Sequence, residues 1–261
     1  MLKETLTRTR AARPLVHCIT NYVTANDCAN LLLAAGASPI MADDPQEAAE
    51  ITAACQALVL NLGTPGPRRL EAMLAAGREA NRLGHPIVFD PVGVGSSGFR
   101  MEAASALLRE LRLCIIRANA GEIHSLCCGV AGTRGVDTDA AVSVTESRAL
   151  ARETGAVVVC TGETDIVTDG QTAFRVYGGH PMTRLITGAG CQTSALAGAF
   201  AAANPPLGAA LGAACAMKRC AGIAHARLGP QEGSASLRNY LIDAVCLLRP
   251  QDLKDVRYDI L

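Results

Sequence analysis

Short apolar runs alternate along the chain with longer segments whose apolar residues recur at helical spacing. The short runs are nearly continuous, a pattern typical of strands buried on both faces of a parallel sheet. They predict strands within residues 14–21, 37–42, 57–63, 87–91, 114–117 and 156–162, and a strand, turn and strand over 165–179. The longer segments predict helices within residues 24–35, 44–55, 68–83, 101–111, 141–154, 207–228 and 234–248.

This order of elements predicts a three-layer α/β fold with a mainly parallel central sheet. A loop is expected over residues 129–138, but no linker, repeat or low-complexity tract divides the chain. Residues 1–261 are therefore expected to form one domain. Because only 3% of the residues are aromatic, its core should be aliphatic and rich in alanine, with closely packed helices.

Charge and hydropathy narrow the choice of partners. The 24 lysines and arginines balance the 24 acidic residues, and no basic run stands out, which argues against nucleic acids and anionic membrane surfaces. Residues 1–13 are polar and lack the apolar core of a secretory signal. The most apolar stretch, 207–217, is ended by Lys218 and Arg219 before it could span a membrane. We expect a cytoplasmic protein.

The 11 cysteines are scattered and contain no CxxC pair, and we see no metal-ligand spacing among the cysteines and histidines. In a reducing compartment such cysteines usually serve as small buried hydrophobic residues. We expect the same structural role for the five histidines. His17 is the least certain of them because it lies in the first predicted strand.

A glycine-rich turn over residues 186–194 (ITGAGCQTS) precedes a run of small helix-forming residues. Glycine permits the tight turn, and the helix that follows begins with free N–H groups and a positive dipole. Such a helix start can bind an anion, and phosphate is the first ligand to consider. The spacing matches neither the P-loop nor the dinucleotide-binding pattern. Taken alone, the turn is also compatible with a capped helix that has no ligand.

Polar side chains follow several of the predicted strands, and the carboxyl ends of parallel strands line one crevice. These side chains are Asn61, Asp90, Arg117 with Asn119 and Glu122, and Thr161. Asp90 and Glu122 offer hard oxygen ligands for Mg²⁺, and Arg117 offers a permanent forked charge for a polyphosphate. Together they indicate phosphoryl transfer. Each also has an ordinary structural role available, as a turn, a helix cap or a solvated charge.

Six segments resemble the hydroxyethylthiazole kinases in order and spacing. They are residues 14–21 (PLVHCITN), 36–41 (GASPIM), 90–95 (DPVGVG), 117–123 (RANAGEI), 161–165 (TGETD) and 187–191 (TGAGC). The resemblance extends from about residue 14 to the last predicted helix. It implies a ribokinase-like fold without a separate lid domain, and a homotrimer with active sites between subunits. It also implies ATP-dependent phosphorylation of the thiazole alcohol in thiamine salvage, with Mg²⁺.

The resemblance also implies roles for individual residues. Arg117 and Thr161 would bind ATP, and Asp90 and Glu122 would organise Mg²⁺. The thiazole would be contacted by Met41 and Gly188, with Asn21 nearby. Whether Asp43 and Asp44, beside Met41, face the same ligand stays open.

Cys191 occupies the position where sugar kinases of this broader fold usually carry an aspartate base, and the thiazole kinases resemble this chain in having cysteine. An exposed thiol at a helix N-terminus can have a lowered pKa. Our hypothesis is that Cys191 lies next to the substrate hydroxyl and acts as a weak base or a positioning group. The N–H groups of Gly188, Ala189, Gly190 and Cys191 would hold the developing negative charge.

Three other interpretations remain open. A kinase acting on hydroxymethylpyrimidine or pyridoxal would share the ATP and Mg²⁺ residues. A transferase or hydrolase could use Cys191 as a nucleophile activated by a histidine. A non-catalytic nucleotide-binding sensor could use the same scaffold, because fold does not fix function.

Overall fold

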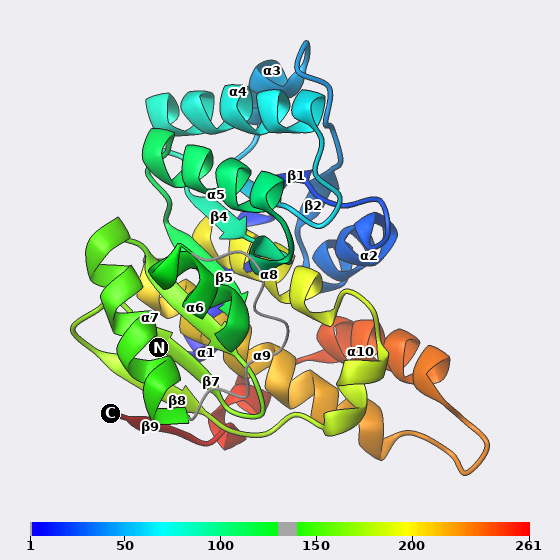
Figure 1. Cartoon of the computed structure of the whole chain (residues 1–261). Helices are drawn as coiled ribbons and strands as arrows, with labels where there is room; N and C mark the ends of the chain where they lie inside the picture. Colours follow the sequence, from blue (N-terminus) through cyan, green and yellow to red (C-terminus); the bar gives the residue numbers. More distant parts are fainter. Residues whose placement is uncertain (1, 130–139) are drawn as a thin grey trace.

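A twisted β-sheet forms the centre of the computed structural model, which describes residues 2–129 and 140–261 (Figure 1). In this part of the chain the sheet has nine strands in the order β2-β1-β3-β4-β5-β6-β7-β8-β9. The strands are β1 (Leu15–Ile19), β2 (Ser38–Ile40), β3 (Ala57–Asn61), β4 (Ile87–Asp90), β5 (Ile115–Asn119), β6 (Val157–Thr161), β7 (Asp165–Thr168), β8 (Ala173–Val176) and β9 (Tyr258–Ile260). Strands β1 to β6 pair in parallel and β7 to β9 antiparallel, so the mainly parallel sheet is confirmed.

Helices cover both faces of the sheet and complete the predicted three layers (Figure 1). One face carries α1 (Leu2–Ala12), α2 (Ala25–Ala35), α8 (Ala189–Ala201), α9 (Pro206–Ala226) and α10 (Ser234–Leu247). The other carries α3 (Ala48–Ala54), α4 (Pro67–Leu83), α5 (Gly98–Glu110), α6 (Ala120–Cys128) and α7 (Ala140–Thr154). Three short 3₁₀ helices lie in the connections: η1 (Val94–Ser96), η2 (Pro181–Leu185) and η3 (Pro250–Asp255).

The continuous apolar runs contribute to two hydrophobic cores, one on each face of the sheet. Alternate residues of a strand point to opposite faces, so Ala57 and Val59 pack with one set of helices while Leu58 and Leu60 pack with the other. All four are buried. This is why the runs show no polar alternation, as expected for a parallel sheet covered on both sides.

Some boundaries and two elements differ from the prediction. The helix expected from residue 44 begins only at Ala48, because the Asp44 carboxylate accepts a hydrogen bond from the Gln46 N–H and forms a turn. Helix α1 and strand β9 were not predicted, since a short polar helix and a three-residue edge strand carry little periodic signal. Gly129 ends α6 in the left-handed conformation, and the rest of the loop expected over 129–138 lies outside the described residues.

Helix α9 is long enough to cross a membrane and has a mean hydropathy of 1.2 over its most apolar window. In the described part of the chain it is the one helix that meets these criteria, but 72% of that window is buried inside the protein. It packs against α8 and α10 and against β6 to β8. These contacts identify α9 as a core helix.

The cysteines behave largely as expected, because seven of the 11 are buried and all are free. His17 is also structural. It is fully buried in β1, with Nδ1 paired to the Thr52 hydroxyl at 2.8 Å and Nε2 to the Ala42 carbonyl at 2.7 Å. Burial lowers the pKa of His17, although the Ala42 carbonyl opposes this effect.

His17 should make the protein less stable in acid. The unfolded chain takes up a proton near pH 6.5, but the folded chain resists protonation because the pKa of His17 is lowered. The unfolded state therefore binds more protons, and folding stability should fall as the pH drops below about 6.5, by at most about 1.4 kcal/mol per pH unit. Denaturant unfolding of the wild type and of His17→Gln at pH 5 and pH 7.5 would measure this. An equal acid loss in both proteins would contradict the prediction.

Candidate functional site

The predicted glycine-rich turn does open a helix. Gly188 is the N-cap of α8, with φ of +83°. The first N–H to find an acceptor within the helix is that of Gln192, which donates to the Gly188 carbonyl at 2.9 Å. The N–H groups of Ala189, Gly190 and Cys191 therefore have no acceptor within the helix, as at any helix start. Free N–H groups at a helix start can bind an anion.

Two glycines of the turn are required by close neighbours. A Cβ atom on Gly188 would lie 2.3 Å from the Thr24 side chain, and the left-handed backbone there also disfavours other residues. A Cβ atom on Gly190 would lie 2.3 Å from Nη1 of Arg117. The absence of a side chain at Gly190 thus lets the Arg117 guanidinium lie directly against the first turn of α8.

Asp90 lies beneath this helix start at the end of β4 and is fully buried. Its Oδ2 accepts hydrogen bonds from Asn61 Nδ2 at 2.9 Å and from the Ser194 hydroxyl at 2.7 Å. Its Oδ1 is 3.5 Å from Nη1 of Arg117. Burial raises the pKa of Asp90, while Arg117, Ser194 and Asn61 act in the opposite direction by stabilising the carboxylate.

Arg117 joins two neighbouring strands. It projects from β5, and its Nη2 donates to the Thr161 hydroxyl at the end of β6. Desolvation acts to lower the pKa of Arg117, but the nearby carboxylates, led by Asp90 and Glu122, outweigh it and raise the pKa. Arg117 therefore stays charged and presents a fixed cation beside the start of α8.

Glu122 lies in the first turn of α6, where it forms a capping box with Asn119. Its Oε2 accepts from the Asn119 N–H at 2.9 Å, and its Oε1 accepts from the Gly93 N–H at 2.8 Å. Burial raises the pKa of Glu122, and the negative charge of Asp90 raises it further. Arg117 and the N–H groups of Asn119 and Gly93 act in the opposite direction by stabilising the carboxylate.

Cys191 is buried in the first turn of α8. The side chain is only 8% exposed, and burial together with the Asp90 charge raises the pKa of Cys191. Asn61 Nδ2 lies 3.2 Å from Sγ and Asn21 Nδ2 lies 3.5 Å from it. The thiol faces the buried network around Asp90 instead of open solvent, so the helix start does not lower its pKa.

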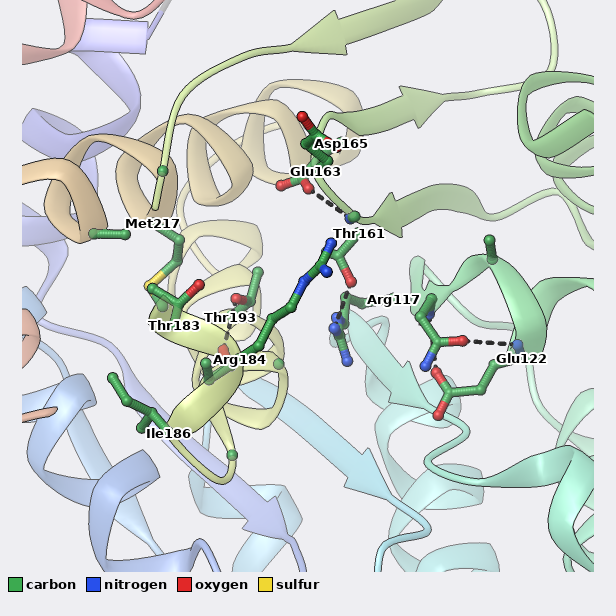
Figure 2. Close-up of a pocket in the computed structure, with 18 of the residues that line it drawn as sticks. Arg117, Glu122, Thr161, Glu163, Asp165, Thr183, Arg184, Ile186, Thr193 and Met217 are labelled. Carbon is green, nitrogen blue, oxygen red and sulfur yellow. Dashed lines mark hydrogen bonds between the residues drawn. The ribbon is translucent and has the colours of Figure 1, made fainter. Parts of the chain in front are cut away.

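An open pocket of about 1400 Å³ faces the start of α8 (Figure 2). Of the predicted residues, its walls include Arg117, Glu122, Thr161, Gly188, Ala189 and Gly190. Asp90, Cys191, Asn21 and Met41 do not line it. Asp90 and Cys191 lie behind the pocket wall, in the hydrogen-bonded layer that holds Arg117 and α8 in place.

The residues that the resemblance assigns to the thiazole differ in their surroundings. Asn21 is buried and donates to Asn61 Oδ1 at 2.9 Å, so it belongs to the layer around Asp90. Met41 follows the edge strand β2 and is 38% exposed. Asp43 pairs with Arg69 and Asp44 pairs with Arg68 at the surface. Both carboxylates therefore point toward α4.

The sequence reading missed two cations at the pocket, Lys218 and Arg184. Lys218 is already engaged, because its Nζ donates to the carbonyls of Gly162 and Glu163 and pairs with Asp165 at 3.1 Å. Arg184 extends from η2 into the pocket (Figure 2). Within residues 2–129 and 140–261 it forms no ion pair or hydrogen bond. No local pattern distinguishes it, since it is a single arginine in an irregular connection.

Comparison with known proteins agrees with this geometry. The family model described as "Hydroxyethylthiazole kinase family" matches residues 6–251. A hydroxyethylthiazole kinase of Clostridium acetobutylicum is 45% identical, with 99% of each chain covered. One of Methanocella arvoryzae is also 45% identical, over 97% of this chain and 95% of the relative.

Solved structures extend the comparison to the fold. The hydroxyethylthiazole kinase of Pyrococcus horikoshii OT3 superposes with a TM-score of 0.92 at 34% identity, covering 100% of this chain and 98% of that one. A pyridoxal kinase of Staphylococcus aureus has a TM-score of 0.64 at 15% identity, covering 95% of this chain and 97% of that one, a likeness of fold alone. The expected ribokinase-like fold is confirmed, and the chain belongs to the hydroxyethylthiazole kinase family.

Proposed function

We propose that the protein transfers the γ-phosphoryl group of ATP to the hydroxyl of 4-methyl-5-(2-hydroxyethyl)thiazole, in thiamine salvage. The family match and the printed names of the relatives support this substrate. The structural observation that carries the proposal is the Arg117 guanidinium, fixed by Asp90 and Thr161 directly against the free N–H groups of α8. A cation and a helix start that face one pocket suit a polyphosphate.

In this proposal the chain's main contribution is position and charge. Phosphoryl transfer places negative charge on the transferred group and on the leaving oxygen, and it requires little covalent chemistry from the protein. Arg117 and the N–H groups of Ala189 and Gly190 would stabilise that charge. The substrate hydroxyl would attack the γ-phosphorus in line with the leaving ADP. It forms the new P–O bond as the bond to ADP breaks, and its proton is released.

Asp90 and Glu122 suit Mg²⁺ by their chemistry. Both carboxylates are hard oxygen donors, and the pKa of Glu122 is raised partly by the charge of Asp90, a repulsion that a divalent cation would relieve. Their oxygens already accept hydrogen bonds, so we propose that they hold the ion partly through water. Bound there, Mg²⁺ would neutralise charge on the β- and γ-phosphates.

We propose a homotrimer with the thiazole bound between subunits. Support comes from exposed apolar side chains around the loop between β1 and α2 and on α2 itself: Tyr22, Val23 and Leu33. Met41 is also exposed and lies outside the main pocket. A second copy covering this surface would bring the exposed Met41 out of water. Light scattering of the purified protein would test the assembly, and a stable active monomer would exclude it.

The activity can be tested directly with ATP, Mg²⁺ and hydroxyethylthiazole, using mass spectrometry to detect the phosphorylated product. Parallel reactions contain hydroxymethylpyrimidine or pyridoxal. We expect product from the thiazole. Product from a parallel reaction alone would show that the protein is a kinase for hydroxymethylpyrimidine or pyridoxal instead. ATP binding without any product would favour a nucleotide-binding sensor.

We also propose that Arg184 contacts the bound polyphosphate. The side chain is exposed and extends into the pocket, and within the described residues it forms no ion pair (Figure 2). Arg184→Ala should raise the KM for ATP roughly tenfold, because a charge-assisted contact contributes about 1.5 kcal/mol or more. The melting temperature should not change. Steady-state kinetics would measure this, with the exposed Arg82→Ala as the control.

Cys191 should not act as a base, because burial raises the pKa of its thiol and keeps it protonated near pH 7. Cys191→Ser is therefore expected to keep turnover within about tenfold of the wild type, since a hydroxyl can still accept the hydrogen bonds of Asn61 and Asn21. The pH profile of kcat would check this. A loss of more than a thousandfold in kcat with normal ATP binding would show that the thiol takes part in the chemical step.

We propose a cytoplasmic location. The 11 cysteines are free, and three of them, Cys127, Cys128 and Cys246, are exposed. Such thiols persist in a reducing compartment. Fractionation of cells and immunodetection of the protein would test the location.

A further inference from the structure

A second group of potential ligands lies along α6, on the C-terminal side of Glu122. His124 and Cys128 are one turn apart on α6, and Glu146 projects toward them from α7. His124 Nδ1 lies 2.7 Å from Glu146 Oε1. Cys128 Sγ lies 3.8 Å from each of the two ring nitrogens of His124. His124 and Cys128 are four residues apart, a spacing that the sequence analysis did not single out.

These separations suit a transition metal. Bond lengths of about 2.0–2.3 Å to nitrogen, oxygen and sulfur around a tetrahedral ion place the ligand atoms roughly 3.3–3.8 Å apart. The donor atoms of the three residues all lie within 4.8 Å of one another. The His124–Glu146 contact must lengthen from 2.7 Å, and side-chain rotation can provide this.

The environment supports a bound ion over a simple ion pair. Glu146 uses Oε1 to contact His124, but its Oε2 is buried and has no hydrogen-bond partner within residues 2–129 and 140–261. An unpartnered buried carboxylate oxygen is costly, and a metal ion would satisfy it. Cys128 is exposed, so an ion can enter from solvent.

We propose that His124, Cys128 and Glu146 bind a divalent ion of the zinc class, Zn²⁺ or Cd²⁺, with water as the fourth ligand. The thiol and imidazole donors select against Mg²⁺, so this site is chemically distinct from the one proposed at Asp90. Cys128 binds as the thiolate and releases its proton to solvent. The ion joins α6 to α7 and thereby fixes the helix whose first turn carries Glu122.

Cadmium titration of the purified full chain tests the site through the ultraviolet charge-transfer band of a cadmium–thiolate bond. The experiment uses the apoprotein with millimolar Mg²⁺ and without nucleotide, in a Cys246→Ser background that removes another exposed thiol. We expect saturation at one ion per chain. Cys128→Ser should abolish the band, and His124→Gln and Glu146→Gln should each weaken binding roughly tenfold or more.

Cys127→Ser is the matched control, because Cys127 is the neighbouring exposed cysteine and its thiol donates to the Glu146 carbonyl, at 3.7 Å. It should bind cadmium like the parent. Equal loss in Cys127→Ser and Cys128→Ser, unchanged binding in Cys128→Ser, or no saturable band in the parent would each overturn the proposal. None of these readouts depends on kinase activity.

Zinc should also stabilise the fold, which provides a second measurement. At about a hundredfold excess over the dissociation constant, Zn²⁺ should raise the melting temperature of the parent by roughly 5 °C. The shift should be absent in His124→Gln and retained in Cys127→Ser. A shift of equal size in His124→Gln would contradict the ligand set.

Discussion

Asp90→Asn is expected to lose roughly a thousandfold in kcat while keeping the shape of the site. Asparagine can preserve hydrogen bonds to Asn61 and Ser194, but it removes the charge that faces Arg117. The guanidinium then loses the anchor that holds it beside α8, and the proposed Mg²⁺ site loses a carboxylate. Single-turnover formation of phosphorylated thiazole would measure the loss of the chemical step.

Asp44→Asn is the matched control for this change, because it removes a surface carboxylate that pairs with Arg68, while asparagine can still accept the hydrogen bond from the Gln46 N–H. Its kcat should equal that of the wild type. Circular dichroism must show that Asp90→Asn is folded at the assay temperature. A folded Asp90→Asn enzyme with more than a tenth of wild-type kcat would remove Asp90 from the proposed mechanism.

Gly190→Ala is expected to weaken productive ATP use about a hundredfold, although it adds only one methyl group. The new Cβ would lie 2.3–2.6 Å from the Arg117 guanidinium, so the cation must leave its position. A small misplacement of a charge-stabilising group costs on the order of 10²-fold in rate. Measurement of kcat/KM for ATP, together with calorimetric ATP binding, would show the effect.

Gly222→Ala is the control for the substitution itself. Gly222 lies within α9, and an added Cβ there would have no atom within 4 Å. Alanine should leave activity unchanged and stabilise the helix slightly, by about 0.5–1 kcal/mol. If Gly190→Ala retained wild-type kcat/KM, the tight contact with Arg117 would not matter for function.

The sequence alone determined most of the helices and strands. It also determined the edge of the sheet at which the polar side chains gather. Continuous apolar strands demand cover on both faces, and right-handed strand–helix–strand units bring all parallel strand ends to one edge. Asn61, Asp90, Arg117 and Thr161 therefore converge as predicted. The glycines before Cys191 also indicated the helix start, because few other residues permit that turn.

Only the tertiary structure decided what each group's surroundings are. The thiol of Cys191 and the carboxylate of Asp90 have raised pKa values because distant segments exclude water from them, and no local pattern reports that exclusion. The same holds for Arg184, which enters the pocket from an irregular connection, and for Glu146, which meets His124 across two helices. Burial and cross-helix contacts depend on how the layers pack, whereas periodicity records only which face of each element is apolar.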